Sequence, residues 1–272
     1  MKNIYGTIGY TILKNNKSNK KIIIFADMHD TLPSCINQIS ISDWFKTKFD
    51  SSKILLEEVN RDGIELEELW SNAPHTQELK NLFISNSQVI HAIDIRPQLT
   101  PFSWELIEGM NFDNYISLKN YIEEIDNFFC LKSKYFIKNI LNYNINKLPH
   151  TKLGKHFMII KKNYKNFLQE NINSKNYEIK EIYSNKPEIF YQINNILDEI
   201  MEWYICANII LDDNKQIILH TGLAHSEKVI RWLLVHYKYI ILNKYGVNTL
   251  DETTYNMSGC VQLPSDIDKQ FS

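Results

Sequence analysis

Four short apolar segments, each ending in polar or charged side chains, constrain the fold of this chain more than any other feature. Their sequences are KIIIFA (21–26), KILLEEV (53–59), QVIHAIDIRP (88–97) and QIILH (216–220). Continuous apolar runs of this length are typical of strands that are buried on both faces of a parallel sheet. Segments with helical patterns lie between and after them, at 40–49, 64–70, 76–84 and 226–237. The alternation predicts an α/β fold with a mostly parallel central sheet flanked by helices.

Several local expectations follow from the same patterns. The segment IYGTIGYTIL (4–13) predicts one further strand, joined to 21–26 through the lysine-rich turn KNNKSNKK. Ser42 and Ser226 precede helical patterns and are expected to cap them. The segment 239–246 fits either a last strand or a continuation of the helix before it.

The middle of the chain has a helical pattern only. Apolar residues recur at helical spacing from Phe190 to Tyr204, behind Pro187, and weaker helical patterns occur near 125–129 and 135–141. We therefore expect an α/β core formed by 1–110 and 213–250, an all-helical insertion or lid at 111–212, and an irregular tail at 251–272.

Composition narrows the class of protein. The 272 residues are 44% hydrophobic and carry a net charge of -2, which allows a sizeable core and favours no nucleic-acid partner. Lysines gather at 14–21 and 161–165, but asparagines separate them. No apolar run has the length of a membrane span, and the N-terminus does not resemble a signal peptide. The four cysteines have no metal-knuckle spacing, so we expect reduced thiols and a cytoplasmic location.

The polar ends of the four apolar segments are the candidate site. The residues are Asp27, His29 and Asp30, then Glu57 and Glu58, then Asp94 and Arg96, and finally His220 and His225. In an open parallel sheet, the carboxyl ends of the strands lie at one rim, where ligands bind. Aspartate is common at turns, so each end taken alone is explained by a turn. Four ends that all carry acids, histidines or an arginine predict one catalytic or metal-binding rim.

The spacing assigns provisional roles within this rim. Asp27 and His29 are two residues apart, so on an extended backbone a carboxylate can orient and activate an imidazole. Alternation lets only one of Glu57 and Glu58 face the site, and we favour Glu58. Asp94 and Arg96 can pair, or Arg96 can hold an anionic group.

The remaining histidines divide into two groups. His220 and His225 flank a turn at Gly222 that leads to a helix N-terminus, where backbone N–H groups can stabilise an anion. The others are expected to be structural: His75 starts a helix beside Pro74, and His91 lies in a strand.

Three known families share parts of these motifs. FADMHDTL (25–32) resembles the DxDxT motif of haloacid-dehalogenase phosphatases, but His29 stands where that family has its acid/base aspartate. DMH and HTGLAH resemble motifs of metallophosphoesterases, although the chain lacks the Gly-Asp and Gly-Asn dipeptides of that family.

The fullest resemblance is to the superfamily of erythromycin esterases, ChaN-like haem-binding proteins and TraB/TIKI proteins. ADMH (26–29) is similar to its GExH motif, with Asp27 for Glu. ILLEE (54–58) and AIDIRP (92–97) are similar to its acidic strands, and GLAH (222–225) to its closing GxxH motif.

The resemblance implies a hydrolase, either an esterase or a metal-dependent peptidase, acting on a small-molecule or peptide substrate. Its expected catalytic residues are Asp27, His29, Glu58 and His225, which would also be the ligands of a metal, with Mn, Zn or Fe favoured over Mg. Its expected substrate-binding residues are Asp30, Asp94, Arg96 and His220. The alternatives are a non-catalytic ligand- or haem-binding protein of the same fold, a metallophosphoesterase-like enzyme, and an interaction module.

Overall fold

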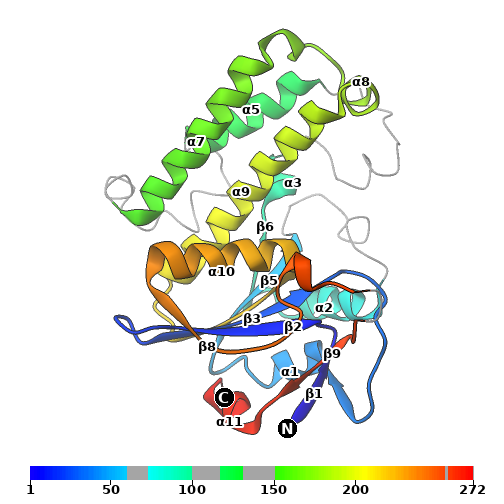
Figure 1. The fold of residues 1–272 in the computed structure, drawn as a ribbon, viewed down its shortest axis with the longest axis vertical. Coiled ribbons are helices and arrows are strands. Elements are labelled where there is room, and N and C mark those ends of the chain that lie inside the picture. The colour runs from blue at the N-terminus through cyan, green and yellow to red at the C-terminus, as the bar shows by residue number, and fades with distance from the viewer. Residues whose placement is uncertain (60–72, 100–116, 131–150, 255–256, 272) are drawn as a thin grey trace. The chain divides into compact units, whose positions relative to one another are not determined.

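The structure, a computed structural model, describes residues 1–59, 73–99, 117–130, 151–254 and 257–271 (Figure 1). The chain divides into two compact units. The first comprises Met1–Glu58, Trp70–Ile93 and Asp212–Ser272, and the second comprises Val59–Leu69 and Asp94–Leu211. The helix expected at 64–70 and the one expected at 135–141 lie outside the described residues.

A six-stranded mixed sheet forms the centre of the α/β fold, as predicted. Its strands, in spatial order, are β6 (Ile90–Asp94), β5 (Lys53–Val59), β7 (Gln216–Gly222), β3 (Lys20–Asp27), β2 (Gly9–Asn15) and β8 (Tyr239–Gly246). Strand β7 pairs in parallel with both β3 and β5, so their carboxyl ends lie at the same rim. Strand β2 is antiparallel to β3 and to β8, which settles 239–246 as a strand.

Strand β3 is buried on both faces, which explains its unbroken apolar run. Phe25 contacts the rings of Trp44 and Phe45 in helix α1 (Ile41–Lys46). On the other face, Ala26 packs with Leu223 at the start of helix α10 (Leu223–Tyr237). Figure 1 shows α10 and α1 on opposite sides of the strands. Full burial of side chains this large contributes roughly 1.5–3 kcal/mol each.

The single strand expected at 4–13 is two strands in two sheets. Gly6 has φ +97°, a left-handed conformation that ends β1 (Lys2–Tyr5) before β2 begins. Strand β1 pairs in parallel with β4 (Gln38–Ser40) and antiparallel with β9 (Cys260–Leu263). The expectation of an irregular tail is therefore wrong, since 251–272 contains β9 and helix α11 (Ser265–Gln270), with the short 3₁₀ helix η4 (Leu250–Glu252) at its start.

Both predicted serine caps are displaced by a few residues. Ser40 caps α1: its extended backbone precedes the helix, and its Oγ accepts a hydrogen bond from Asp43 N at 3.1 Å. Ser42 already lies inside that helix. Helix α10 begins directly after Gly222, so Ser226 lies in its first turn and donates to the Leu223 carbonyl at 2.8 Å.

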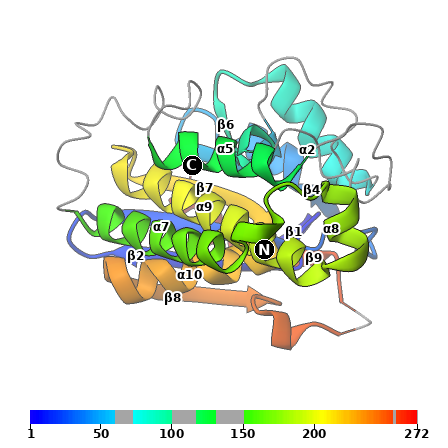
Figure 2. The ribbon, with the colours of Figure 1, turned by 90° about the horizontal axis from the view of Figure 1, so that it is seen from above.

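The described elements of the second unit are helices. They are α3 (Arg96–Leu99), α5 (Leu118–Phe129), α7 (Lys152–Glu170), η3 (Ile172–Ser174), α8 (Ile179–Asn185) and α9 (Pro187–Leu211). Helix α9 begins at Pro187, as predicted. Figures 1 and 2 show α7 alongside α9. Phe128, Phe157 and Trp203 join α5, α7 and α9 through ring contacts.

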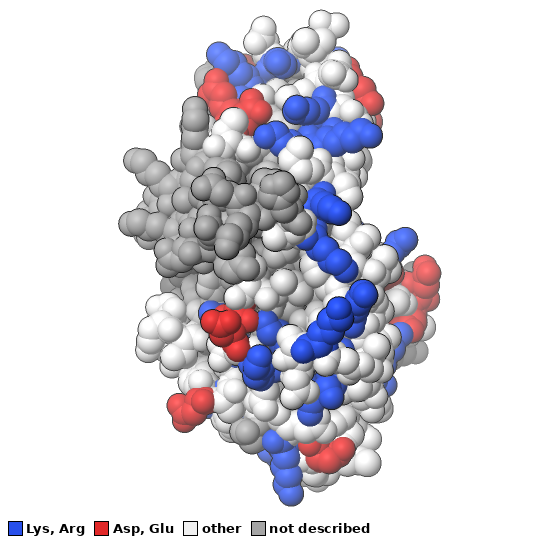
Figure 3. Space-filling view, turned by 90° about the vertical axis from the view of Figure 1, so that its left-hand side faces the viewer, with Lys and Arg blue, Asp and Glu red and all other residues white. Residues whose placement is uncertain are grey.

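The lysine-rich segments are surface features of the β2–β3 turn and of α7. Lys17, Lys162 and Lys165 are exposed. Figure 3 shows one face of the molecule, where uncharged side chains lie between the Lys and Arg side chains. The expectation of no nucleic-acid partner depends on the near-neutral net charge and stays a prediction. Within the described ranges, no helix has the length and apolar character needed to cross a membrane.

Two cysteines form a disulfide, which corrects the expectation of four reduced thiols. Cys35 and Cys260 are bonded across a sequence separation of 225 residues. The strand pairing of β4 and β9 with β1 brings them together, a nonlocal contact that spacing alone does not reveal. Cys130 and Cys206 are free thiols. The disulfide counts against a reducing cytoplasm as the location of the folded protein.

We predict that Cys35→Ser lowers the free energy of unfolding by about 2–4 kcal/mol, because the disulfide closes a very long loop in the unfolded chain. Urea unfolding without reductant measures the difference. Cys130→Ser, at an exposed free thiol, is the matched control and should leave the urea midpoint unchanged. Equal midpoints for wild type and Cys35→Ser would show that the disulfide does not stabilise the protein.

Candidate functional site

The carboxyl ends of β3, β5 and β7 bring a cluster of acids and histidines together in the first unit. Asp27 of β3 lies opposite Gly222 of β7 in the parallel register. Glu57, near the end of β5, reaches the same place: its Oε2 accepts hydrogen bonds from Gly222 N at 2.5 Å and from Thr221 Oγ1 at 2.6 Å. The rim predicted from the strand ends therefore exists on these three strands.

Asp27 is the buried centre of the cluster. Its side chain has no exposed surface, and its two oxygens lie against different imidazoles. His75 Nε2 donates to Oδ1 at 2.8 Å, and His29 Nδ1 lies 2.9 Å from Oδ2. Burial by itself raises the pKa of the Asp27 carboxyl, but the bonds from His29 and His75 outweigh it and hold the pKa below its ordinary value. Asp27 is therefore a carboxylate at neutral pH.

His29 is the exposed member of the cluster. Its backbone has φ +54°, an uncommon conformation outside glycine, which turns the chain directly after β3. The side chain is 40% exposed, with Nδ1 facing Asp27 and Nε2 lying 3.5 Å from Glu57 Oε2. Burial lowers the pKa of His29, but Asp27 and Glu57 together raise it well above its ordinary value. The geometry therefore favours an imidazolium held between two carboxylates.

Glu57, and not the favoured Glu58, is the glutamate beside His29. Its other oxygen, Oε1, lies 3.8 Å from His225 Nε2. Alternation along β5 turns Glu58 to the opposite face, where its side chain is buried. The sequence does not reveal which face meets the end of β7. The contact between Glu57 and Thr221 decides it.

Five side chains thus form one alternating row of imidazoles and carboxylates: His75, Asp27, His29, Glu57 and His225. Such a row can orient the His29 ring, although the 3.8 Å contact between Glu57 and His225 is too long for a hydrogen bond. His75 does start helix α2 (Pro74–Ser85), as predicted, but it is fully buried against Asp27. The expectation of a purely structural His75 missed this contact, and no spacing in the sequence signals it.

The other predicted site residues are not members of this row, although His220 lies close enough to Asp27 to help lower the pKa of its carboxyl. His220 is buried in the sheet and contacts the Gly6 carbonyl through Nε2 at 3.1 Å, and burial lowers its pKa. Asp30 is exposed and accepts a hydrogen bond from the Thr31 N–H at 2.7 Å. The Gly222 N–H, expected to stabilise an anion, donates to Glu57 instead.

Asp94 and Arg96 pair with each other in the second unit. Arg96 Nε and Nη2 donate to the two oxygens of Asp94, both at 2.9 Å, and Nη1 donates to Asp198 at 3.0 Å. The bidentate pair was one of the two expected arrangements. A substrate-binding role for Asp94 and Arg96 stays a prediction.

The cluster does not reproduce the four-residue metal set expected from the sequence. Glu58 turns away, and both Asp27 oxygens lie against imidazoles. In the part of the chain that the structure describes, no group of three or more His, Cys, Asp or Glu residues is arranged to hold a metal ion.

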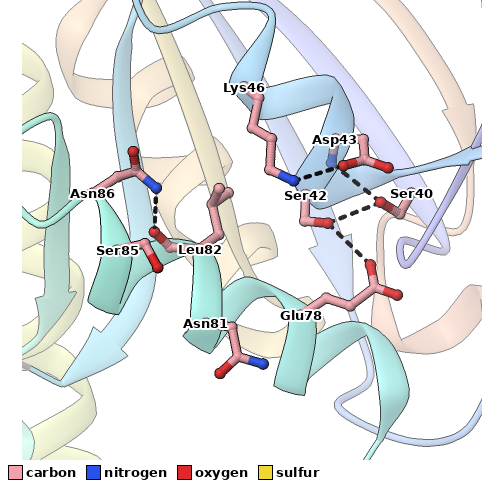
Figure 4. Close-up of a pocket in the computed structure, with 9 residues that line it drawn as sticks. All are labelled: Ser40, Ser42, Asp43, Lys46, Glu78, Asn81, Leu82, Ser85 and Asn86. Atoms are coloured by element: carbon pink, nitrogen blue, oxygen red, sulfur yellow. Dashed lines mark hydrogen bonds and ion pairs between the residues drawn. The ribbon is translucent and has the colours of Figure 1, made fainter.

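A separate hollow lies between α1 and α2 (Figure 4). Its volume is about 430 Å³. Some of its polar groups interact with one another: Ser42 Oγ donates to Glu78 at 3.0 Å, and Lys46 pairs with Asp43 at 2.8 Å. The lining residues are Ser40, Ser42, Asp43, Lys46, Glu78, Asn81, Leu82, Ser85 and Asn86. This hollow contains none of the predicted site residues.

Comparisons with known proteins add no relative to this geometry. Neither the family models, nor the curated proteins, nor the solved structures contain a match to the chain. The resemblance to the erythromycin esterase superfamily therefore depends on the residues of the motifs, and any function must be argued from the row His75–Asp27–His29–Glu57–His225.

Proposed function

We propose that the protein is a hydrolase in which His29 transfers the proton. The observation that carries the proposal is the partly exposed imidazole of His29, held between the carboxylates of Asp27 and Glu57. A buried carboxylate on one ring nitrogen fixes the orientation of the ring, and the second nitrogen then meets the substrate. The motif resemblance and the location at a sheet rim support the same reading.

The charge of the site favours His29 as a general acid. Both carboxylates raise its pKa well above the ordinary value, which favours the protonated ring that can donate to a leaving group from Nε2. This revises the expected role of general base. Glu57, which lies beside the same nitrogen, is the group placed to take a proton from water. Turnover should consequently fall as the pH rises through the pKa of His29.

The proposal predicts hydrolysis that depends on His29. A panel of ester, peptide and phosphoester substrates should reveal one class with turnover that decreases at least about 100-fold in His29→Gln. His236→Gln, at an exposed histidine of α10, is the matched control and should behave as wild type. A wild-type protein with no His29-dependent turnover on any of the three classes would refute the hydrolase.

Two measurements on the same sample test the alternatives. Metal analysis of protein purified without chelator, compared with His29→Gln, tests the Mn, Zn or Fe cofactor that the family resemblance implies. A Soret absorbance band would instead favour the haem-binding alternative.

We also propose that 111–212 is an insertion built from helices alone. The described elements from α5 to α9 support it, with one isolated bridge between Ser117 and Glu178.

A further inference from the structure

Several features of the surrounding structure hold the His75 ring in place. Pro74 begins α2, so His75 stands in the first turn and points its ring at Asp27. Gly6 makes room for it, because a Cβ at Gly6 would lie 2.9 Å from His75 Cβ. The Tyr5 ring covers it edge-on, with ring centres 6.0 Å apart. The imidazole is fully buried.

The two ring nitrogens of His75 have different surroundings. Nε2 lies 2.8 Å from Asp27 Oδ1, whereas Nδ1 is buried and has no hydrogen-bond partner among the described residues. Because the carboxylate can only accept, the proton of a neutral His75 belongs on Nε2. An apolar side chain would fill the same space without burying an unpaired nitrogen. The contribution of this imidazole therefore lies in its bond to Asp27.

That bond contributes to how Asp27 meets His29. His75 Nε2 is the side-chain donor that holds Oδ1, at 2.8 Å, and it adds to a backbone donor on the same oxygen. Oδ2 then lies 2.9 Å from His29 Nδ1, a charge contact and not an aligned hydrogen bond, since Oδ2 accepts no hydrogen bond from the described residues. The Met28 N–H also donates to Oδ1 at 2.8 Å, so Oδ2 is the oxygen left to face His29.

We propose that His75 is a positioning residue: its Nε2–H holds the Asp27 carboxylate in the orientation that aligns His29. Its consequence for turnover rests on the proposed hydrolase function, whereas the alignment itself does not. The side chain of His75 is fully buried and would not touch substrate.

The alignment can be tested by NMR on protein labelled with ¹⁵N at histidine. In the wild type, we expect His75 to be the Nε2–H tautomer, and His29 to show an Nδ1–H proton that is shifted downfield and exchanges slowly with water. The Nδ1–H tautomer at His75 would overturn the proposal and requires no variant. Asp27→Asn assigns the His29 signal, because it removes the charge that faces Nδ1.

Two variants of similar size separate positioning from packing. His75→Gln carries an amide N–H that reaches Asp27, whereas His75→Leu fills the space without a donor. We expect the His29 Nδ1–H signal to persist in His75→Gln and to be lost to rapid exchange in His75→Leu. An unchanged His29 signal in folded His75→Leu would overturn the proposal. Should His75→Leu not fold, the shorter His75→Asn, which cannot reach Asp27, replaces it with the same expectations.

Turnover gives a separate readout. On the substrate class that the panel identifies, His75→Leu should lower kcat by at least about 10-fold with little change in KM. His75→Gln should retain most of the wild-type kcat. Absence of turnover in the wild type refutes the hydrolase but leaves the NMR result to decide the role of His75.

Discussion

Asp27→Asn is expected to abolish most turnover and to lower the free energy of unfolding by about 1.5–3 kcal/mol at pH 7, the usual contribution of hydrogen bonds to a charged group. The substitution hardly changes volume, but it removes the charge that faces both His29 and His75. An amide also offers its own N–H group to one of two imidazole donors. We expect turnover to decrease by about 10³–10⁴-fold, which lies in the upper part of the range that general acid–base catalysis usually contributes.

Kinetics and urea unfolding of Asp27→Asn measure the two effects separately. Asp30→Asn is the matched control: it makes the same chemical change three residues further along, at an exposed side chain, and should alter stability by less than about 0.5 kcal/mol. If Asp27→Asn were as stable and active as Asp30→Asn, the buried row of imidazoles and carboxylates would not form in solution.

Asp27→Asn should also weaken the dependence of the free energy of unfolding on pH. The pKa of Asp27 is lowered in the folded state, so its contribution is present above about pH 3.9, the ordinary value, and is lost as the pH falls through the folded pKa. The pKa of His29 is raised, so its contribution is present below about pH 6.5 and is lost as the pH rises through the folded pKa. Urea midpoints between pH 3 and pH 9 should fall at both ends in the wild type and fall less in Asp27→Asn. Parallel curves for the two proteins would contradict this assignment.

The parts of the fold that the sequence predicts are those with a strong local pattern. Strands β3, β5 and β7 each carry an apolar run that has to be buried, and α9 begins at a proline followed by a helical repeat. Strand β9 has only four residues and is stabilised by pairing with β1, more than 250 positions away in the chain. Its own sequence therefore gives little indication of a strand. The break at Gly6 also depends on nonlocal contacts, because its N–H donates to the Gly259 carbonyl.

The same distinction separates the predicted and the missed site residues. Asp27, His29 and His225 follow directly from parallel strands that end at one rim. Choosing between Glu57 and Glu58 requires knowing which face of β5 points toward Thr221 of β7. That depends on how β5 pairs with β7, which the sequence of β5 does not reveal. His75 reaches Asp27 only because α2 packs at the end of β3, and nothing in its neighbours along the chain marks it as polar and buried.

Gly222→Val should reduce turnover by about 100-fold or more while preserving the fold. Gly222 has φ −54° and ψ 149°, which valine adopts without strain, so the effect comes from added volume. A Cβ there would lie 3.1 Å from His29 Nε2 and 3.4 Å from Glu57 Oε2, and the γ-methyl groups of valine extend the crowding. Displacement of a catalytic group by about 1 Å can cost 100-fold in rate.

Two further variants test whether the effect of Gly222→Val comes from the volume added beside His29. Gly222→Ala adds one methyl group and should have a smaller effect in the same direction. Thr221→Val removes the hydroxyl that donates to Glu57 without adding volume, so it tests the orientation of Glu57 alone. Kinetics and circular dichroism of these proteins measure the effects. We expect turnover to decrease from wild type to Gly222→Ala to Gly222→Val, whereas the secondary structure stays the same. Wild-type turnover in Gly222→Val would mean that the nitrogen of His29 facing Gly222 takes no part in the reaction, because no substrate could approach it past the valine.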